Sequence, residues 1–208
     1  MGISSLIWRV TVTLIIAYTE NELNTKQGKS EFNEGLMKQI AILSDTHGLL
    51  REPVMAELAE ADCFIHAGDI ETPYITESIQ KLGETYVVRG NNDKEWAEDL
   101  PKSITVTIEG VRFFIVHNKK DIPKYLTDID VVVYGHSHKY SAEIINGVLF
   151  LNPGSCGKRR FNLELTMCRM TVDAGHYQYE KVLIPINDLC NMWVNRNLSS
   201  SFELQDIS

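Results

Sequence analysis

Five apolar segments of this chain end directly in side chains that bind divalent metal ions, and these endings constrain the fold more than any other feature. In chain order, the segments and their endings are 40–44 before Asp45 and His47, 63–67 before Asp69, 86–89 before Asn91 and Asn92, 113–116 before His117, and 131–134 before His136 and His138. Short apolar runs bounded by Gly, Asp and Asn are typical of buried strands. Because the carboxyl ends of parallel strands meet at one edge of an open α/β sheet, where ligands bind, we expect these side chains to converge there.

The segments between these endings favour helices, so strand and helix alternate in the first half of the chain. Residues 49–61 carry apolar side chains at helical spacing. Thr72 before Pro73 predicts a helix start, and that helix should run to about Leu82. A shorter helix is expected at 122–126. This order predicts parallel strands joined by right-handed crossovers.

Hairpin signals dominate after His138. Segments 142–145 and 148–151 flank Asn146-Gly147, a strong signal for a two-residue turn. Segments 163–172 and 177–186 form a second pair around residues 173–175. We therefore expect the second half to be mostly antiparallel, and two sheets to pack face to face with helices outside.

The length and composition fit one globular domain. The chain has 208 residues, of which 44% are hydrophobic. We expect the domain at 37–186, an N-terminal extension at 1–36 outside the core (or a misassigned start), and a C-terminal tail at 187–208. The apolar run 6–18 contains Arg9, is shorter than the ~20 residues of a membrane helix and lacks signal-peptide features. No membrane span is expected, although a peripheral membrane contact through this run stays open.

Charge and cysteine usage exclude some classes of partner and site. The formal net charge of −8 argues against a nucleic-acid polymer as partner, because a phosphate backbone requires a basic surface. The four cysteines form no C-x-x-C pair, so free buried thiols are favoured over disulfides or thiolate metal sites. Free thiols suit a reducing, cytoplasmic compartment. A homo-oligomer is compatible with the sequence.

The types of residue at the strand ends indicate a metal site with oxygen and nitrogen ligands. The seven candidate ligands are Asp45, His47, Asp69, Asn91, His117, His136 and His138. Carboxylate, amide and imidazole groups suit Mn, Fe, Zn, Ni or Co. Seven ligands are too many for one tetrahedral ion but suffice for two ions that share a bridging carboxylate. Asp69 is the best candidate for the bridge, because it lies between the first pair and the later ligands in strand order.

Local spacing indicates how the ligands reach the site. Asp45 and His47 are two residues apart, as are His136 and His138, and in an extended chain such side chains point the same way. Each pair is therefore expected to reach one site from one strand end. A glycine directly precedes a ligand candidate at three of the endings, where we expect it to let the backbone turn sharply. These glycines are Gly68, Gly90 and Gly135.

A two-metal site of this kind predicts phosphoester hydrolysis. Two ions about 3.5–4 Å apart would clamp a phosphoryl group and activate a bridging hydroxide. Two carboxylates, two divalent ions and one hydroxide leave a charge of about +1, which would draw a small-molecule phosphoester despite the acidic protein. The hydroxide would attack phosphorus in line, with no covalent enzyme intermediate.

The ordered motifs resemble the signature of calcineurin-like metallophosphoesterases. The motifs are Asp45-x-His47, Gly68-Asp69, Gly90-Asn91-Asn92-Asp93, His117 and Gly135-His136-Ser137-His138. With Asn152-Pro153-Gly154-Ser155, they look most like the small YfcE-type phosphodiesterases over about residues 37–186. The resemblance implies an α/β (α+β) fold, a four-layer αββα sandwich of two mixed sheets flanked by helices. It also implies phosphodiester hydrolysis through a metal-bridging hydroxide.

The resemblance further implies how the ligands divide between two ions. One ion would be held by Asp45, His47, Asp69 and His138, and the other by Asp69, Asn91, His117 and His136. Manganese is the expected metal, with Ni, Fe, Zn or Co also compatible.

Two positions depart from the pattern of many relatives. Asn92 stands where they carry a histidine that protonates or stabilises the leaving group. We expect Asn92 to contact the substrate, but an amide cannot supply a proton at neutral pH, which favours diesters and good leaving groups. His117-Asn118-Lys119 stands where relatives carry His-Gly-His, so the second histidine is missing. Lys119 or Lys120 could offer a positive contact in its place, although solvated lysines are the simpler interpretation.

Two alternatives to a phosphodiesterase stay open. A phosphomonoesterase could use the same site. A non-catalytic scaffold is the second alternative, because one retromer subunit resembles this fold and serves as an interaction module with a degraded metal site. In this chain, however, every ligand position is filled.

Several other polar residues leave more than one interpretation. His66 is a packed strand histidine or a partner of a ligand. Asp93 orients a neighbouring ligand or begins a helix. Arg89 points across the sheet or toward substrate. Residues 152–155 form a turn or a loop that lines the site, and His176 is expected to be exposed in a hairpin turn.

Overall fold

The computed structural model describes residues 37–160 and 162–186, which form two five-stranded sheets. The predicted N-terminal extension and C-terminal tail lie outside the described residues. None of the helices in the described ranges is long and apolar enough to cross a bilayer. Three predicted free thiols, Cys63, Cys156 and Cys168, are free and buried, whereas Cys190 lies outside the described ranges.

The first sheet carries three of the predicted parallel strands. Its order is β10-β9-β1-β2-β3, with β1 at Lys38–Leu43, β2 at Cys63–His66, β3 at Glu84–Val87, β9 at Thr166–Asp173 and β10 at His176–Leu183. Strands β1, β2 and β3 are parallel, and β9 pairs with β1 in the opposite direction. The carboxyl ends of β1, β2 and β3 therefore share one edge.

The second sheet is mixed in the same way. Its order is β4-β5-β6-β8-β7, with β4 at Ser103–Ile108, β5 at Val111–Val116, β6 at Val131–Val133, β7 at Ser141–Ile145 and β8 at Val148–Asn152. Strands β5, β6 and β8 are parallel, whereas β4 and β7 are antiparallel to their neighbours. The second half of the chain is thus less purely antiparallel than predicted, because β8 pairs with β6 as well as with β7.

The predicted hairpin turns are present. Asn146 and Gly147 both have positive φ, 52° and 82°, as a two-residue type I′ turn requires. The β9–β10 hairpin forms as predicted, with slightly shorter strands. His176 is the first residue of β10 and is partly buried, so its predicted place in an exposed turn is wrong.

The main core lies between the two sheets. Ile42 and Ile65 of the first sheet and Phe113 and Val133 of the second are fully buried there. Full burial of such a side chain contributes about 1.5–3 kcal/mol. The packing of both sheets against this core holds their carboxyl edges together.

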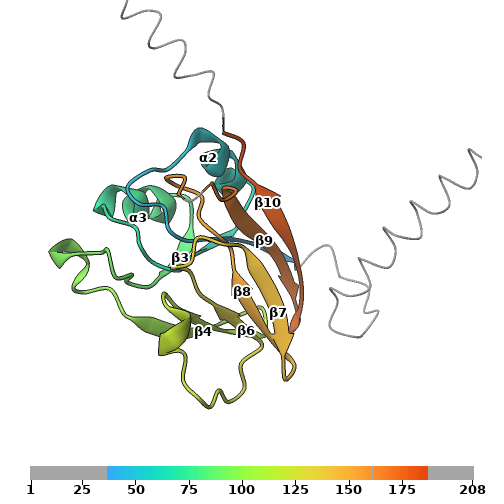
Figure 1. Cartoon of the computed structure of the whole chain (residues 1–208). Coiled ribbons are helices and arrows are strands. Elements are labelled where there is room, and N and C mark those ends of the chain that lie inside the picture. The colour runs from blue at the N-terminus through green and yellow to red at the C-terminus, as the bar shows by residue number, and fades with distance from the viewer. Residues whose placement is uncertain (1–36, 161, 187–208) are drawn as a thin grey trace, which may run out of the picture.

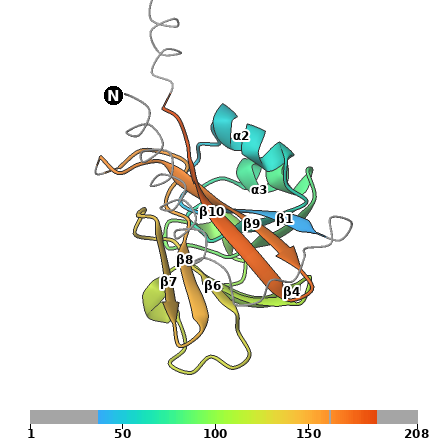
Figure 2. The same cartoon turned by 90° about the vertical axis from the view of Figure 1, so that its right-hand side faces the viewer.

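Helices α2 (Glu52–Ala59) and α3 (Pro73–Gln80) connect the parallel strands of the first sheet and lie together on its outer face (Figures 1 and 2). Val54 and Leu58 of α2 are buried with Ile75 and Ile79 of α3 in a second core cluster. The two longer predicted helices are therefore confirmed. The two mixed sheets with helices outside confirm the predicted α/β sandwich.

The outer face of the second sheet is covered differently. Side chains from 122–129 pack there against Phe114 and Val132, and the predicted helix at 122–126 is wrong. A short 3-10 helix, η2 (Lys119–Asp121), lies directly before this segment. Ile122 is extended, with ψ 127°, because the residue before a proline (Pro123) avoids the helical region.

Candidate metal centre

The five polar strand ends converge, but they come from two sheets rather than one. Three of them follow β1, β2 and β3 of the first sheet, and two follow β5 and β6 of the second. The loops are joined across the sheets, since the His136 backbone N–H donates to Asp45 Oδ2 at 3.0 Å. The expectation of a single sheet edge is therefore wrong, because the site forms where the carboxyl edges of two packed sheets meet.

The backbone at the site is strained rather than extended. Of the eleven non-glycine residues with positive φ in the described part of the chain, five are candidate ligands, namely Asp45, His47, Asp69, His136 and His138. Side chains adopt this left-handed region only at a cost, and such residues cluster at functional sites. The premise that the i, i+2 pairs sit in extended chain is wrong.

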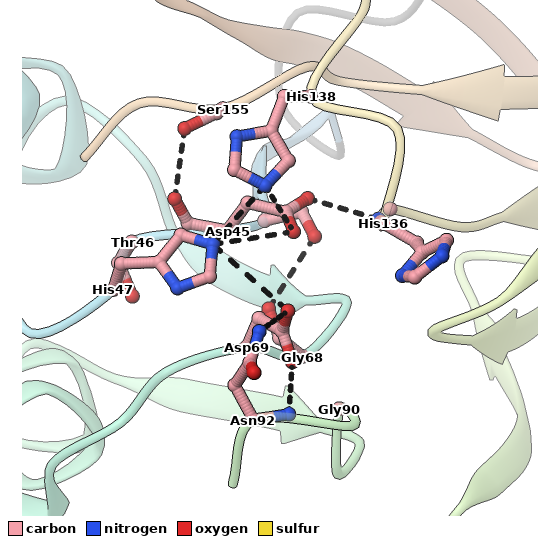
Figure 3. Close-up of polar contacts among 12 residues, drawn as sticks. Asp45, Thr46, His47, Gly68, Asp69, Gly90, Asn92, His136, His138 and Ser155 are labelled. Atoms are coloured by element: carbon pink, nitrogen blue, oxygen red, sulfur yellow. Dashed lines mark hydrogen bonds and ion pairs between the residues drawn. The ribbon is translucent and has the colours of Figure 1, made fainter. Parts of the chain in front are cut away.

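The first ligand group consists of Asp45, His47 and His138, whose ligand atoms all lie within 4.8 Å of one another. His138 Nε2 is 3.4 Å from Asp45 Oδ1 and 3.1 Å from His47 Nε2 (Figure 3). All three side chains are buried. The group therefore brings one carboxylate and two imidazoles together in the protein interior.

The second ligand group consists of Asp69, His117 and His136, also within 4.8 Å of one another. Asn91 joins it, because its Oδ1 lies 3.1 Å from His117 Nε2 and 2.9 Å from His136 Nδ1. His117 Nδ1 must donate its proton to the Ala67 carbonyl at 2.7 Å. In the neutral imidazole, Nε2 then offers a lone pair, and it faces oxygen acceptors that also offer lone pairs.

Asp69 lies between the two groups. Its Oδ2 is 3.9 Å from His47 Nε2 (Figure 3), and it is also 3.4 Å from His117 Nε2. The Asn92 backbone N–H and side-chain amide donate to the two Asp69 oxygens at 2.8 and 2.6 Å. Burial favours the neutral carboxyl, but the interactions with His117 and Asn92 outweigh it and hold the pKa of Asp69 well below its usual range.

Two glycines allow these close approaches. A Cβ on Gly90 would lie 2.2 Å from Asp69 Oδ1, and a Cβ on Gly135 would lie 2.0 Å from Ser44 Oγ. Only Gly68 of the three predicted glycines has positive φ, 91°, and so serves as the predicted sharp turn. Gly90 and Gly135 instead make room for the neighbouring loop.

The polar atoms of the first group fit a bound cation. Asp45 Oδ1 is buried and lacks a hydrogen-bond partner among the described residues, and it lies beside the Nε2 atoms of His47 and His138. Burial raises the pKa of Asp45 to about 6, and burial together with His47 lowers the pKa of His138 to about 4. An uncompensated buried carboxylate is costly, and a divalent ion would remove that cost.

Glu71 is a functional candidate that sequence reasoning missed. Its Oε1 lies 2.6 Å from His47 Nδ1, so Nδ1–H donates to Glu71 and Nε2 presents its lone pair to the site. Glu71 itself has positive φ, 71°, and its Oε2 lies 3.8 Å from Lys158 Nζ. A carboxylate two residues after Asp69 was the available signal.

His66 ties two site loops together without touching a candidate ligand side chain. The Gly68 N–H donates to Nδ1 at 3.2 Å, so Nε2 carries the proton and donates to Thr46 Oγ1 at 3.0 Å. Complete burial lowers the pKa of His66 to about 3. His66 thus links the loop after β1 to the loop after β2.

Asp93 binds backbone groups rather than a ligand. Its Oδ1 accepts from the N–H groups of Ile70 and Glu71 at 2.8 and 2.7 Å, and its Oδ2 accepts from Gly90 N–H at 2.8 Å. Both predicted roles, orienting a ligand or starting a helix, are therefore wrong. Asp93 fastens the loop after β2 to the loop after β3.

Residues 152–155 hold two ligand-bearing loops in place by hydrogen bonds. Asn152 Nδ2 donates to the Gly135 carbonyl at 2.7 Å and to Ser137 Oγ at 3.1 Å. Ser155 Oγ donates to the Asp45 carbonyl at 2.8 Å. The segment is buried and fixes both ligand-bearing loops, so it is more than a surface turn.

Asn118 and Lys119 make their contacts outside the two ligand groups. Asn118 is the N-cap of η2 and accepts from Lys120 N–H at 3.0 Å. Lys119 lies 5.3 Å above the Tyr134 ring and 3.8 Å from Glu143. Neither lysine side chain makes an ion pair with a ligand group in the described structure, as the simpler reading predicted.

Residues 37–175 match the model of the calcineurin-like phosphoesterase superfamily domain. The chain belongs to the calcineurin-like phosphoesterase superfamily. The predicted family is therefore confirmed, together with its coarse properties, a metal-binding phosphoesterase domain of the hydrolase type.

Individual relatives agree with this assignment. A phosphodiesterase of Methanocaldococcus jannaschii is 30% identical over 141 residues, which are 57% of this chain and 84% of that protein. The phosphoesterase YfcE of E. coli superposes with a TM-score of 0.54 and 23% identity, covering 71% of this chain and all of that one. Vacuolar protein sorting 29 of Cryptosporidium parvum superposes with a TM-score of 0.60 and 17% identity, covering 73% of this chain and all of that one. The two structural likenesses show the fold.

Proposed function

We propose that this chain hydrolyses small-molecule phosphodiesters with two divalent metal ions. The observation that carries the proposal is the position of Asp69, whose Oδ2 faces His47 of the first ligand group and His117 of the second. A carboxylate oxygen placed between two sets of imidazoles is the arrangement that a shared bridge requires.

The candidate ligands would be shared between the two ions. The first ligand group with Asp69 would hold one ion, and the second ligand group with Asn91 would hold the other. Two bound ions would activate water as the nucleophile and stabilise negative charge on the phosphoryl oxygens. Glu71 orients His47 before any substrate arrives, and His66 and Asp93 fasten together the loops that carry the ligands.

Asn92 is the proposed catalytic and substrate contact. Its amide donates to Asp69 at 2.6 Å and is partly exposed, so it lies at the surface of the site beside the bridge. An amide can donate to a phosphoryl oxygen but cannot protonate a leaving group at neutral pH. This chemistry favours diesters with good leaving groups, and the M. jannaschii relative is named a phosphodiesterase.

Manganese is the metal we propose first, because it accepts carboxylate and amide oxygens together with imidazole. Cytoplasmic residence is also part of the proposal, since the three buried free thiols fit a reducing compartment.

The test compares two chromogenic esters in the presence of Mn²⁺ or excess chelator. Purified full-length chain should release p-nitrophenol faster from bis(p-nitrophenyl) phosphate than from p-nitrophenyl phosphate, and chelator should abolish the release. Asp69→Asn should lower metal-dependent turnover by more than about 100-fold, because an amide has one acceptor oxygen and no charge with which to bridge. Metal analysis should find two ions per wild-type chain.

Asp128→Asn is the matched control. Asp128 is exposed and pairs weakly with Arg112 at 3.9 Å, so the same substitution should leave turnover unchanged. Faster hydrolysis of the monoester would replace the diesterase with a phosphomonoesterase.

A non-catalytic scaffold is the second candidate, supported by the likeness to vacuolar protein sorting 29. It predicts a protein without metal-stimulated hydrolysis, whether or not metal is bound, because one solved structure of that protein, from Entamoeba histolytica, is a zinc complex. Chelator-sensitive turnover would exclude it.

A further inference from the structure

A pocket of about 340 Å³ opens beside the second ligand group. It is lined by Arg89, Gly90, Asn91, Lys102, His117, Asn118 and Asp121. Asn91 and His117 belong to the candidate metal centre, so the pocket continues directly from the place where a phosphoryl group would bind. The part of a substrate beyond its phosphate can therefore occupy this space.

Arg89 is held in the pocket wall without being neutralised. Its Nε donates to the Asp93 carbonyl at 3.2 Å, and its backbone N–H donates to the Pro101 carbonyl at 2.8 Å. No ion pair among the described residues includes Arg89 or Lys102. The terminal guanidinium nitrogens thus keep their donors for another partner.

The lack of an ion pair at Arg89 is not shared by all arginines of the chain. Arg169, by contrast, pairs with both Glu57 and Glu180. In the pocket, Arg89 and Lys102 face the single carboxylate of the lining, Asp121, which leaves one positive charge in excess in a chain of net charge −8. A fixed guanidinium with free donors is well suited to carboxylate or phosphate.

The pocket on the other side of the centre has the same excess of one positive charge, from Lys139 and Lys181 against Glu164, but no arginine among the described residues of its lining. It has a volume of about 260 Å³ and lies beside His138, with Lys139, Glu164 and Lys181 in its wall. Lys181 is already paired with Glu164 at 2.5 Å. An anionic group would gain less on that side.

We propose that the substrate is a phosphodiester whose second ester arm carries a further anionic group, a carboxylate or a phosphate, bound by Arg89 and Lys102. This rests on the proposed function, and it names the class of substrate that the same site takes. The two residues determine specificity and bind the arm, whereas the ligand groups act on the phosphodiester.

The test uses p-nitrophenyl diesters that differ only in the second arm, which is propyl, 2-carboxyethyl or 2-phosphoethyl. The readout is the ratio of kcat/KM for each anionic arm to that for propyl, which cancels effects common to all three. The Mn²⁺-loaded wild type should prefer an anionic arm by about tenfold or more, as expected for a charge-assisted contact. Arg89→Gln and Lys102→Gln should each reduce that ratio, and the double variant should bring it near one.

Calorimetry supplies a readout without turnover. The metal-loaded wild type should bind 2-carboxyethylphosphonate more tightly than propylphosphonate, Arg89→Gln should reduce the difference, and the double variant should remove it. Lys139→Gln changes the same charge in the opposite pocket and should preserve both ratios.

The outcomes separate this inference from the proposed function. If no diester releases p-nitrophenol, the proposed function fails. If all three arms are hydrolysed with equal kcat/KM, or if Lys139→Gln lowers the ratio as much as Arg89→Gln, the diesterase stands and the anionic subsite is overturned. The relative preference for carboxyethyl and phosphoethyl arms identifies which anion the pocket takes.

Discussion

The two ligand groups have the same composition, one aspartate and two histidines, but they differ in exposure. Asp45 and His47 are 0% exposed and His138 is 5% exposed. In the second group His136 is exposed, as is the neighbouring Asn91, and a pocket opens beside them. Asp69 and His117 are buried as well, at 2% and 4% exposed, so one group is enclosed throughout whereas the other reaches solvent through His136.

Burial gives the first group a stronger need for its ion. The Asp45 carboxylate accepts a hydrogen bond from the His136 N–H at Oδ2, but its Oδ1 has no donor among the described residues, and a buried charge with an unmet hydrogen bond is costly. The second group can be hydrated when empty, since part of it faces solvent. We therefore expect the first group to bind its ion more tightly and the second to exchange its ion and meet the substrate.

The largest effect should come from removing one histidine from each group. His47→Ala should weaken binding of the tighter Mn²⁺ ion by more than about 100-fold, because it removes a ligand from a buried site. His136→Ala should weaken mainly the looser ion, and by less. Calorimetric titration of metal-free protein with Mn²⁺ resolves the two events. Equal losses of affinity in the two variants would contradict the distinction between a fully buried group and one that reaches solvent.

A smaller effect is expected at Glu71, which orients His47 only. Glu71→Gln keeps the size of the side chain but removes the charge that accepts from His47 Nδ1, and it should weaken the tighter ion about 10–100-fold. The looser ion should be unaffected. Glu77→Gln, an exposed change on α3, is the matched control. An equal loss of affinity for both ions would mean that Glu71 acts through the electrostatic field of the whole site rather than through His47.

The smallest effect concerns pH and the link between the two loops through His66. Its pKa is lowered from 6.5 unfolded to about 3 folded, so only the unfolded state takes up its proton between these values. Stability of the metal-free protein should therefore fall as pH drops below about 6.5, by about 1.4 kcal/mol per pH unit from this group alone.

His66→Gln tests this contribution, because Gln can still donate to Thr46 and accept from Gly68 without titrating. Urea unfolding at pH 7, 6 and 5 should show a flatter decline for His66→Gln than for the wild type. His176→Gln, on partly buried β10, should keep the wild-type slope. A slope unchanged by His66→Gln would mean that His66 does not stay neutral in the folded chain.

Much of the fold followed from local patterns. Alternating apolar runs and helical spacing predicted β1, β2, α2 and α3, and Asn146-Gly147 predicted the β7–β8 turn. The helix expected at 122–126 failed for a local reason too, since Pro123 keeps Ile122 extended. Local sequence patterns did not predict that the polar strand ends come from two sheets, because strand pairing depends on contacts between distant segments.

The sequence alone determined which side chains reach the site, because each candidate ligand directly follows an apolar run that must be a buried strand. The family resemblance implied how they group, whereas local spacing placed His136 and His138 at one site, and the tertiary structure decides between the two. His136 and His138 are two residues apart, yet left-handed backbone turns them to different groups. Glu71 reaches His47, and Asp93 reaches Gly90, through hydrogen bonds set by packing. Such contacts depend on backbone angles and on the distance between two sheets, which no local pattern of residues encodes.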